Sequence, residues 1–120
     1  MQDLVIQKTS DTPAITFQPG EDTLRIEGRS IPENAPQFYE PVFNWLEQDA
    51  TELSGAQKLV IKLDYFNTSS SKCLLRILVQ MDKLYSDNPG LSIEWHVEED
   101  DYDMQESVEE YQDLVSIPIT

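Results

Sequence analysis

The chain has very few of the residues from which metal sites and covalent active sites are usually built. Its 120 residues include one cysteine, Cys73, and one histidine, His96. A single cysteine excludes an internal disulfide and a cysteine-cluster metal site. The four glycines stand apart from one another, so the glycine-rich loop that binds phosphate is absent. A nucleophile–histidine–acid enzyme therefore has no positional support.

Basic residues and long apolar runs are also scarce. Eight lysines and arginines stand against 23 aspartates and glutamates, which gives a formal net charge of −15. Nucleic acids and anionic membrane surfaces are bound through basic patches, so this balance excludes both as partners. No apolar run approaches the ~18 residues of a membrane span, and the N-terminus lacks the residue order of a signal peptide. We expect one cytoplasmic domain over residues 1–120, without membrane insertion.

The negative charge is concentrated in the last third of the chain. Leu84 to Thr120 contain eleven acidic residues and no lysine or arginine. Because large apolar side chains interrupt this stretch, we interpret it as folded, with one acidic face. Within it, the run from Glu98 to Asp103 has two interpretations. It is either a weak site for a divalent cation, although it lacks the order of an EF-hand loop, or a set of solvated acids that cap a helix.

Strand patterns occur at five places. They cover Leu4–Ile6, Ala14–Phe17, Thr23–Glu27, Lys58–Leu63 and Leu91–Val97. A hairpin turn at Gln18–Asp22 is expected to join the second and third, and the fourth is expected to be central in the sheet. The alternation in the fifth places Leu91, Ile93, Trp95 and Val97 on one face. A last fragment, Val115–Ile119, fits an edge strand, because Pro118 cannot donate to a ladder.

Helical apolar periods lie between these strands. They cover Phe38–Leu46, Leu74–Tyr85 and Met104–Val115. Pro41 lies inside the first stripe, so that helix should start late or kink there. Cys73 lies on the apolar face of the second helix, which predicts a buried and unreactive thiol. Trp45 and Trp95 fall on core faces.

The predicted order is β-β-β-α-β-α-β-α, with or without a final strand. Strands joined through helices imply right-handed parallel crossovers, whereas the first strands suggest a hairpin. The sequence therefore predicts an α/β fold, with a mixed sheet covered by helices.

The junction before the second helix carries four consecutive hydroxyl residues. Thr68, Ser69, Ser70 and Ser71 follow Asn67 and a hydrophobic strand. One interpretation is that Thr68 or Ser69 caps the helix and the others tolerate the turn. The other is a regulatory phosphosite, because a phosphoryl group at a helix start meets free backbone N–H groups and the positive end of the helix dipole.

Segments spread over nearly the whole chain carry a family resemblance. They are Thr12–Ile15, Gly28–Asn34, Phe38–Leu46, Leu63–Lys72 and Trp95–Met104. The strand–Asn-Thr-Ser-Ser–helix junction resembles that of STAS-type domains of anti-sigma-factor antagonists. The full set of segments is more similar to the SiaC family of regulatory phosphoproteins, which implies a single STAS-like domain.

The resemblance implies a switch protein and not an enzyme, with no catalytic residue, metal or cofactor. A Ser/Thr protein kinase would phosphorylate Thr68, and a PPM-type protein phosphatase would remove the phosphate. The unmodified form would bind and activate a diguanylate cyclase, which raises cyclic di-GMP and favours biofilm or aggregation. Ser69 and Ser70 match the family's following serines, and Ser71 is a further candidate acceptor.

The surface around this junction also has alternative interpretations. Asn67, Ser69 and Ser70 are candidate partner-binding residues, as are Arg29, Glu33 and Asn34 of the Gly28–Asn34 segment. That segment is better explained as a turn with Asn34 as the cap of the next helix. A rival function is an acidic decoy, which would occupy a basic partner surface by charge without a phosphoswitch. A metal-dependent enzyme that uses the acidic cluster is a more distant alternative.

Overall fold

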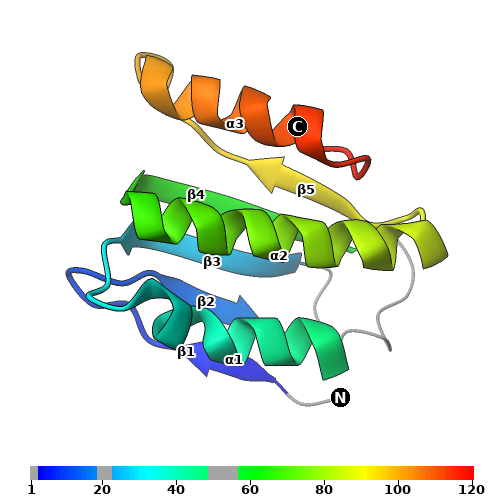
Figure 1. The fold of residues 1–120 in the computed structure, drawn as a ribbon, viewed down its shortest axis with the longest axis horizontal. Coiled ribbons are helices and arrows are strands. Elements are labelled where there is room, and N and C mark those ends of the chain that lie inside the picture. The colour runs from blue at the N-terminus through cyan, green and yellow to red at the C-terminus, as the bar shows by residue number, and fades with distance from the viewer. Residues whose placement is uncertain (1–2, 19–22, 49–56) are drawn as a thin grey trace.

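The computed structural model describes residues 3–18, 23–48 and 57–120, which form a mixed sheet and three helices (Figure 1). The strands are β1 (Leu4–Ile6), β2 (Ala14–Phe17), β3 (Thr23–Ser30), β4 (Lys58–Phe66) and β5 (Ser92–Trp95). The helices are α1 (Ala35–Gln48), α2 (Thr68–Asp87) and α3 (Tyr102–Leu114). This order confirms the predicted α/β fold. In the described part of the chain, no helix is both long and apolar enough to span a membrane.

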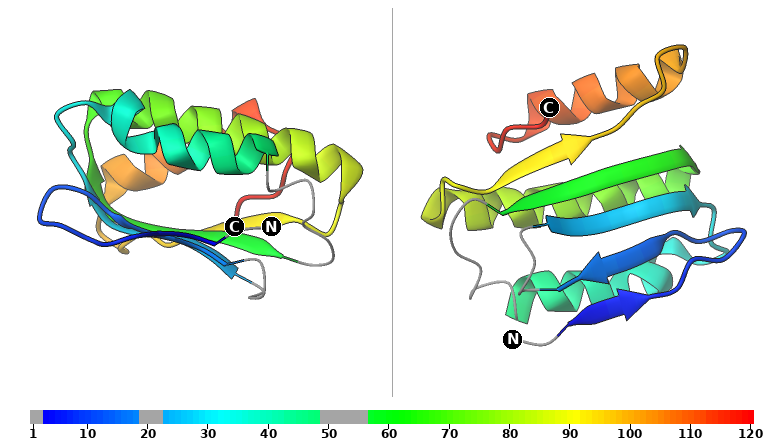
Figure 2. Two further views of the ribbon diagram at one scale, coloured as in Figure 1. Left: turned by 90° about the horizontal axis from the view of Figure 1, so that it is seen from below. Right: turned by 180° about the vertical axis from the view of Figure 1, so that it is seen from behind.

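The five strands follow one another across the sheet in chain order. β1, β2 and β3 pair antiparallel, and β3, β4 and β5 pair parallel. The two parallel crossovers step in the same direction, and such crossovers are right-handed. They therefore leave α1 and α2 on the same face of the sheet, as Figure 2 shows. α3 lies beyond β5, past the edge of the sheet, with β5 between it and α2 in the view of Figure 1.

The core lies between the sheet and the helices. Alternate side chains of the strands point into it, among them the fully buried Ile26 and Ile61. Trp45 and Trp95 are each 4% exposed, which confirms them as core residues. Cys73 is also buried, and burial raises the pKa of its thiol against the opposing effect of Arg76. The prediction of a buried thiol is confirmed. A raised pKa keeps the thiol in its protonated form, which is the unreactive one.

The first helix begins earlier than its proline suggested. α1 starts at Ala35, so Pro41 lies inside the helix. Of the two expectations, the late start is wrong and the kink stays a prediction. Asn34 caps the helix, as predicted, because its Oδ1 accepts a hydrogen bond from the Gln37 N–H at 3.2 Å. A proline inside a helix costs about 3 kcal/mol. Here the burial of six α1 side chains offsets that cost, and Pro41 itself stays on the exposed side.

Several predicted boundaries and faces were wrong. β3 continues past Gly28 to Ser30 through a bulge at Gly28/Arg29, and β4 extends to Phe66. β5 ends at Trp95, so Val97 does not share its buried face and is 37% exposed. Most of the turn predicted at Gln18–Asp22 lies outside the described residues.

The C-terminal fragment forms an isolated bridge in place of the predicted edge strand. Ile119 pairs with Ile93 in parallel, beside β5. The Ile93 N–H donates to the carbonyl of Pro118 at 2.9 Å, and the Thr120 N–H donates to the carbonyl of Ile93 at 3.0 Å. Pro118 has no N–H to extend this ladder, so the pairing stays short. Leu114 belongs to the apolar period predicted over Met104–Val115, but it is 61% exposed because the helix ends there.

The bulge in β3 generates a prediction about Gly28. Its φ of +130° is one that L-residues rarely adopt, and an added Cβ would lie 3.3 Å from Pro13 Cα. We expect Gly28→Ala to lower the free energy of unfolding by about 1–3 kcal/mol in urea denaturation. The control is Gly90→Ala, at an exposed turn residue without positive φ, which should change stability by less than about 0.5 kcal/mol. Equal effects of the two substitutions would contradict a strained backbone at Gly28.

Candidate functional site

The carboxyl ends of β3, β4 and β5 meet at one edge of the sheet. Each of these strands leads into a helix, so the N-termini of α1, α2 and α3 gather along the same edge (Figure 1). In open parallel sheets this edge is where binding sites form, because the connections there are free to vary while the strands hold them in place.

The two junctions singled out in the sequence lie next to each other at this edge. The Asn67 N–H donates to the carbonyl of Ser30 at 3.0 Å, and Arg29 is in register with Tyr65. The structure therefore brings the β3–α1 junction, with its exposed Arg29, Glu33 and Asn34, beside the start of α2. Asn34 has a structural role there as the cap of α1.

Asn67 is the residue that caps α2. Its backbone is extended, and its Oδ1 accepts a hydrogen bond from the Ser70 N–H at 2.9 Å. The prediction that Thr68 or Ser69 provides the cap is therefore wrong. An asparagine amide oxygen makes this bond as readily as a hydroxyl, and here it precedes both. Thr68 and Ser69 become the first and second residues of the helix, with their side chains released from capping.

The four hydroxyl residues fall into two groups. Thr68 and Ser69 are exposed, and neither hydroxyl bonds to another described residue. Ser71 is half-buried, and its Oγ donates to the carbonyl of Thr68 at 2.6 Å. Ser70 is fully buried. Of the candidate acceptors, Thr68 and Ser69 are thus the two whose hydroxyls are free and open to solvent.

Ser70 belongs to a buried hydrogen-bond network and not to the surface. Its Oγ donates to the carbonyl of Ser30 at 3.1 Å and accepts from Ser30 Oγ at 2.8 Å. The Ser30 hydroxyl proton is used in that bond, so the Tyr39 hydroxyl donates to Ser30 Oγ, at 2.6 Å. Burial raises the pKa of Tyr39 to about 12, which keeps the phenol protonated as a donor. The expectation that Ser70 lines a partner surface conflicts with this burial.

α3 is fixed to the same end of α2 by an aromatic residue. The Tyr111 hydroxyl donates to the carbonyl of Ser71 at 2.9 Å, and the Tyr111 ring stacks on Trp95 with centroids 5.4 Å apart. Burial, with a smaller effect of Glu110, raises the pKa of Tyr111 to about 12, so it also stays protonated. The first turn of α2 is therefore fixed by hydrogen bonds on two sides: to α1 through Ser30 and Tyr39, and to α3 through Tyr111.

The acidic run before α3 has capping roles. Asp101 Oδ1 accepts from the Met104 N–H at 3.1 Å, and Asp103 lies in the first turn of the helix. Both positions place negative charge at the positive end of the helix dipole. In the described part of the chain, no group of three or more histidine, cysteine or acidic residues is arranged to hold a metal ion. The geometry thus favours helix capping over cation binding for this run.

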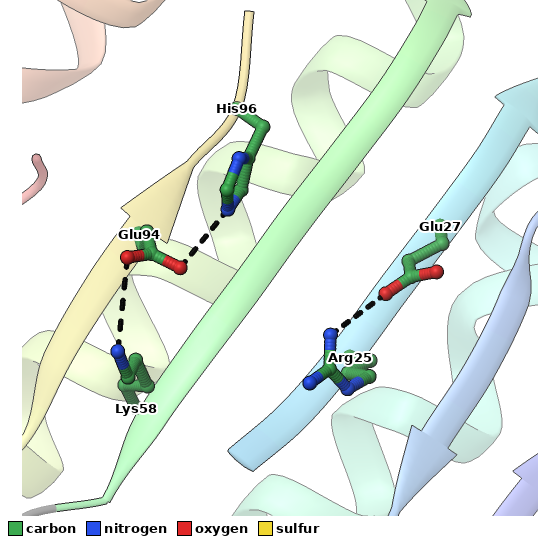
Figure 3. Close-up of polar contacts among 5 residues, drawn as sticks. All are labelled: Arg25, Glu27, Lys58, Glu94 and His96. Atoms are coloured by element: carbon green, nitrogen blue, oxygen red, sulfur yellow. Dashed lines mark hydrogen bonds and ion pairs between the residues drawn. The ribbon is translucent and has the colours of Figure 1, made fainter.

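The sheet face away from α1 and α2 carries paired charges. Figure 3 shows Arg25 with Glu27 at 3.0 Å, and Glu94 between Lys58 at 3.7 Å and His96 at 2.9 Å. The hydrogen bond from His96, followed by the charge of Lys58, lowers the pKa of Glu94. His96 is thus a surface residue of this face. The buried Ser30–Ser70 pair lies on the helix side of the sheet.

Free hydroxyls at the start of a capped helix are accessible to modification, and a phosphate there would meet the positive end of the helix dipole. The family model of SiaC family regulatory phosphoproteins matches residues 6–120, and the chain belongs to this family. The predicted family is therefore confirmed, whereas the STAS-like description stays a prediction.

Similar proteins occur in Pseudomonas aeruginosa. The uncharacterized protein PA14_02130 of strain UCBPP-PA14 is 30% identical over 118 residues, which are 98% of this chain and 94% of that protein. The crystal structure of apo-SiaC has a TM-score of 0.88 at 30% identity and covers 100% of this chain and 98% of its own. A second structure shows SiaC in complex with the diguanylate cyclase SiaD, of which it is the activator. Its TM-score is 0.89 at 30% identity, and the match covers 98% of this chain and 97% of that SiaC chain.

Sequence reasoning missed the residues that position this site. Ser30, Tyr39 and Tyr111 hold the start of α2, yet each lies about 30 or more positions from it in the chain. The regular apolar period of α1 and α3 gives no sign that these tyrosines end in hydrogen bonds. The one clue in the sequence is that both aromatic residues are tyrosines, because the hydroxyl of a buried tyrosine needs a hydrogen-bond partner.

The buried network generates a prediction with a matched control. Ser70→Ala removes the donor to the Ser30 carbonyl and leaves buried polar atoms with fewer partners. We expect it to lower the free energy of unfolding by about 1–3 kcal/mol and to speed amide exchange at the start of α2. Ser69→Ala makes the same change at an exposed neighbour and should cost less than about 0.5 kcal/mol. A Ser70→Ala protein as stable as Ser69→Ala would contradict the role of the network.

Proposed function

We propose that the chain is a cytoplasmic, phosphorylation-switched regulator of a diguanylate cyclase. Its unphosphorylated form binds and activates the cyclase, which raises cyclic di-GMP and favours biofilm or aggregation. A Ser/Thr protein kinase phosphorylates Thr68 and releases the cyclase, and a PPM-type protein phosphatase restores the active form. Membership of the SiaC family and the likeness to SiaC bound to SiaD support the choice of partner.

The exposure of Thr68 at the first position of α2 is the observation that carries the proposal. A kinase needs a free, accessible hydroxyl, and Thr68 has one. The first turn of α2 contains no acidic residue that would repel a phosphate. A phosphoryl group on Thr68 would lie at the positive end of the helix dipole, close to backbone N–H groups. The modified protein is therefore expected to keep its fold.

The effect of the phosphate on binding is local. It adds about two negative charges to a chain that already carries −15, so the total changes little. These charges fall between the start of α2 and the β3–α1 junction. The proposed contact residues are Asn67 and Ser69 at the start of α2, and Arg29, Glu33 and Asn34 on the side of the β3–α1 junction. Two extra charges that a partner must desolvate or face across an interface are enough to break it.

Site-directed variants of Thr68 test the switch. We expect Thr68→Ala to bind the cyclase as the unmodified protein does but to take up no phosphate from kinase and ATP, as measured by intact mass. Thr68→Glu is expected to bind about tenfold or more weakly in titration calorimetry, because a carboxylate carries part of the phosphate charge.

The control is Ser69→Ala, which changes the adjacent exposed hydroxyl and should be phosphorylated like the unmodified chain. Phosphate found by peptide mapping outside Thr68–Ser71, or Thr68→Glu and the authentic phosphoprotein both binding at full strength, would refute the switch. A glutamate carries less negative charge than a phosphate. If Thr68→Glu and the phosphoprotein bind the cyclase differently, the result for the phosphoprotein is the one that counts.

A second candidate, the acidic decoy, is favoured by the exposed acids of α3 and by Glu98, Glu99 and Asp100, which are exposed in the loop before it. Glu106, Glu109, Glu110 and Asp113 are all exposed on α3, with no basic residue on the helix. The same titration separates the two functions. Decoy binding falls steeply with salt and depends on Glu98, Glu99 and Asp100 more than on Thr68. These three are the residues to neutralise, because Asp101 caps α3 and its loss would also loosen the helix.

A further inference from the structure

A groove between α1 and α2 combines an apolar floor with two cationic side chains. This α1–α2 groove is lined by Pro36, Phe43, Ser69, Lys72, Cys73 and Arg76, and its volume is about 380 Å³. Phe43 and Cys73 form a buried floor, at 4% and 6% exposure. The guanidinium of Arg76 lies over the Phe43 ring, 4.1 Å from its centroid. The groove thus offers apolar contact area next to a charge held in a defined position.

The two cations of the groove lack anionic partners among the described residues. Lys72 and Arg76 form no ion pair there, and the same is true of Lys8, Arg29, Lys62 and Lys83, whereas Arg25 and Lys58 on the sheet face are each paired (Figure 3). What sets the two groove cations apart is the apolar floor beside them. Glu40 lines the adjoining hollow with Arg76 but is not within ion-pair distance of it. In a chain with a net charge of −15, unpaired cations at the lip of an apolar groove are the elements of an anion-recognising surface.

We propose that the α1–α2 groove binds an acidic segment of the cyclase, an inference that rests on the function proposed above. The segment carries a carboxylate beside an apolar side chain. Its carboxylate pairs with Arg76 and Lys72, and its apolar side chain packs on Phe43 and Cys73. A guanidinium already spread over an aromatic ring loses little further freedom when it binds a carboxylate, and it can do so through two N–H groups.

The same groove explains why a phosphate on Thr68 would release the partner. Thr68 lies four residues before Lys72, and side chains at this spacing are neighbours on a helix, with Cβ atoms about 6 Å apart. A phosphate there is within reach of the Lys72 ammonium and takes it as an internal partner. It also places two negative charges at the Ser69 end of the groove. Both effects oppose an acidic segment, so phosphorylation replaces an intermolecular ion pair by an intramolecular one.

Charge reversal on α2 tests the groove with the full-length chain and the full-length cyclase of the same organism. Lys72→Glu and Arg76→Glu are each expected to weaken binding by about tenfold or more. Lys83→Glu is the matched control, because it makes the same change on an exposed residue of the same helix, two turns beyond Arg76. It should weaken binding less than about threefold. Thermal unfolding of each variant checks that the fold is kept.

The outcomes separate this inference from the switch. If Thr68→Glu weakens binding but Lys72→Glu and Arg76→Glu do not, the groove assignment is wrong and the switch stands. If the α2 reversals weaken binding and phosphorylation does not, the groove stands and the switch fails. If Lys72→Glu and Lys83→Glu lose equal affinity for the cyclase, the effect is a long-range one of charge, and the groove is not the binding site. A cyclase that does not bind the unmodified chain overturns both.

A measurement without the partner tests the internal ion pair. Phosphothreonine is placed at position 68, and the second pKa of its phosphate is followed by phosphorus NMR. A nearby ammonium favours the dianion, so Lys72→Ala should raise this pKa by a few tenths of a unit, while Lys83→Ala leaves it unchanged. Identical titration curves in all three proteins would contradict the pairing of Lys72 with the phosphate.

Discussion

The main-chain carbonyl of Ser30 holds together the edge of the sheet at which the candidate site lies. It accepts hydrogen bonds from the Asn67 N–H and from Ser70 Oγ, while the hydroxyl of the same residue connects Ser70 with Tyr39. A buried polar group that loses its partner costs about 1–3 kcal/mol, so this small network fixes the start of α2 against β3 and α1. The cap, the exposure of Thr68 and the shape of the α1–α2 groove all follow from that placement.

This arrangement separates the hydroxyls that hold the fold from those that are free to be modified. Ser70 faces inward and is fully engaged, whereas Thr68 and Ser69 face outward without partners among the described residues. Because Asn67 already caps the helix, a change at Thr68 does not remove the cap. A surface switch needs a modification site that does not support the fold. A modification that unfolded the domain would abolish every contact and not only the one with the regulated partner.

Local patterns predicted most of the fold. Alternation marked β2 and most of β3, and the 3.6-residue period marked α2, because each pattern records which side chains one element buries. Predictions failed where packing or pairing with another element decides the local structure. Tertiary packing carries α1 through Pro41, and the short β5 leaves Val97 in solvent. The segment Gly28–Ser30 was predicted as a loop and is a strand, because its pairing with β4 continues past the bulge.

The sequence by itself determined the α/β order, the acidic last third and the position of the hydroxyl cluster before α2, since all three are properties of residues close together in the chain. Tertiary structure alone decided which of those hydroxyls are free. Ser30 and Ser70 are forty positions apart, and the groove joins two helices. Such contacts depend on how α1 and α2 pack on the sheet, and no local spacing encodes them. The same run of four hydroxyl residues therefore contains one residue buried in the core and two open to solvent.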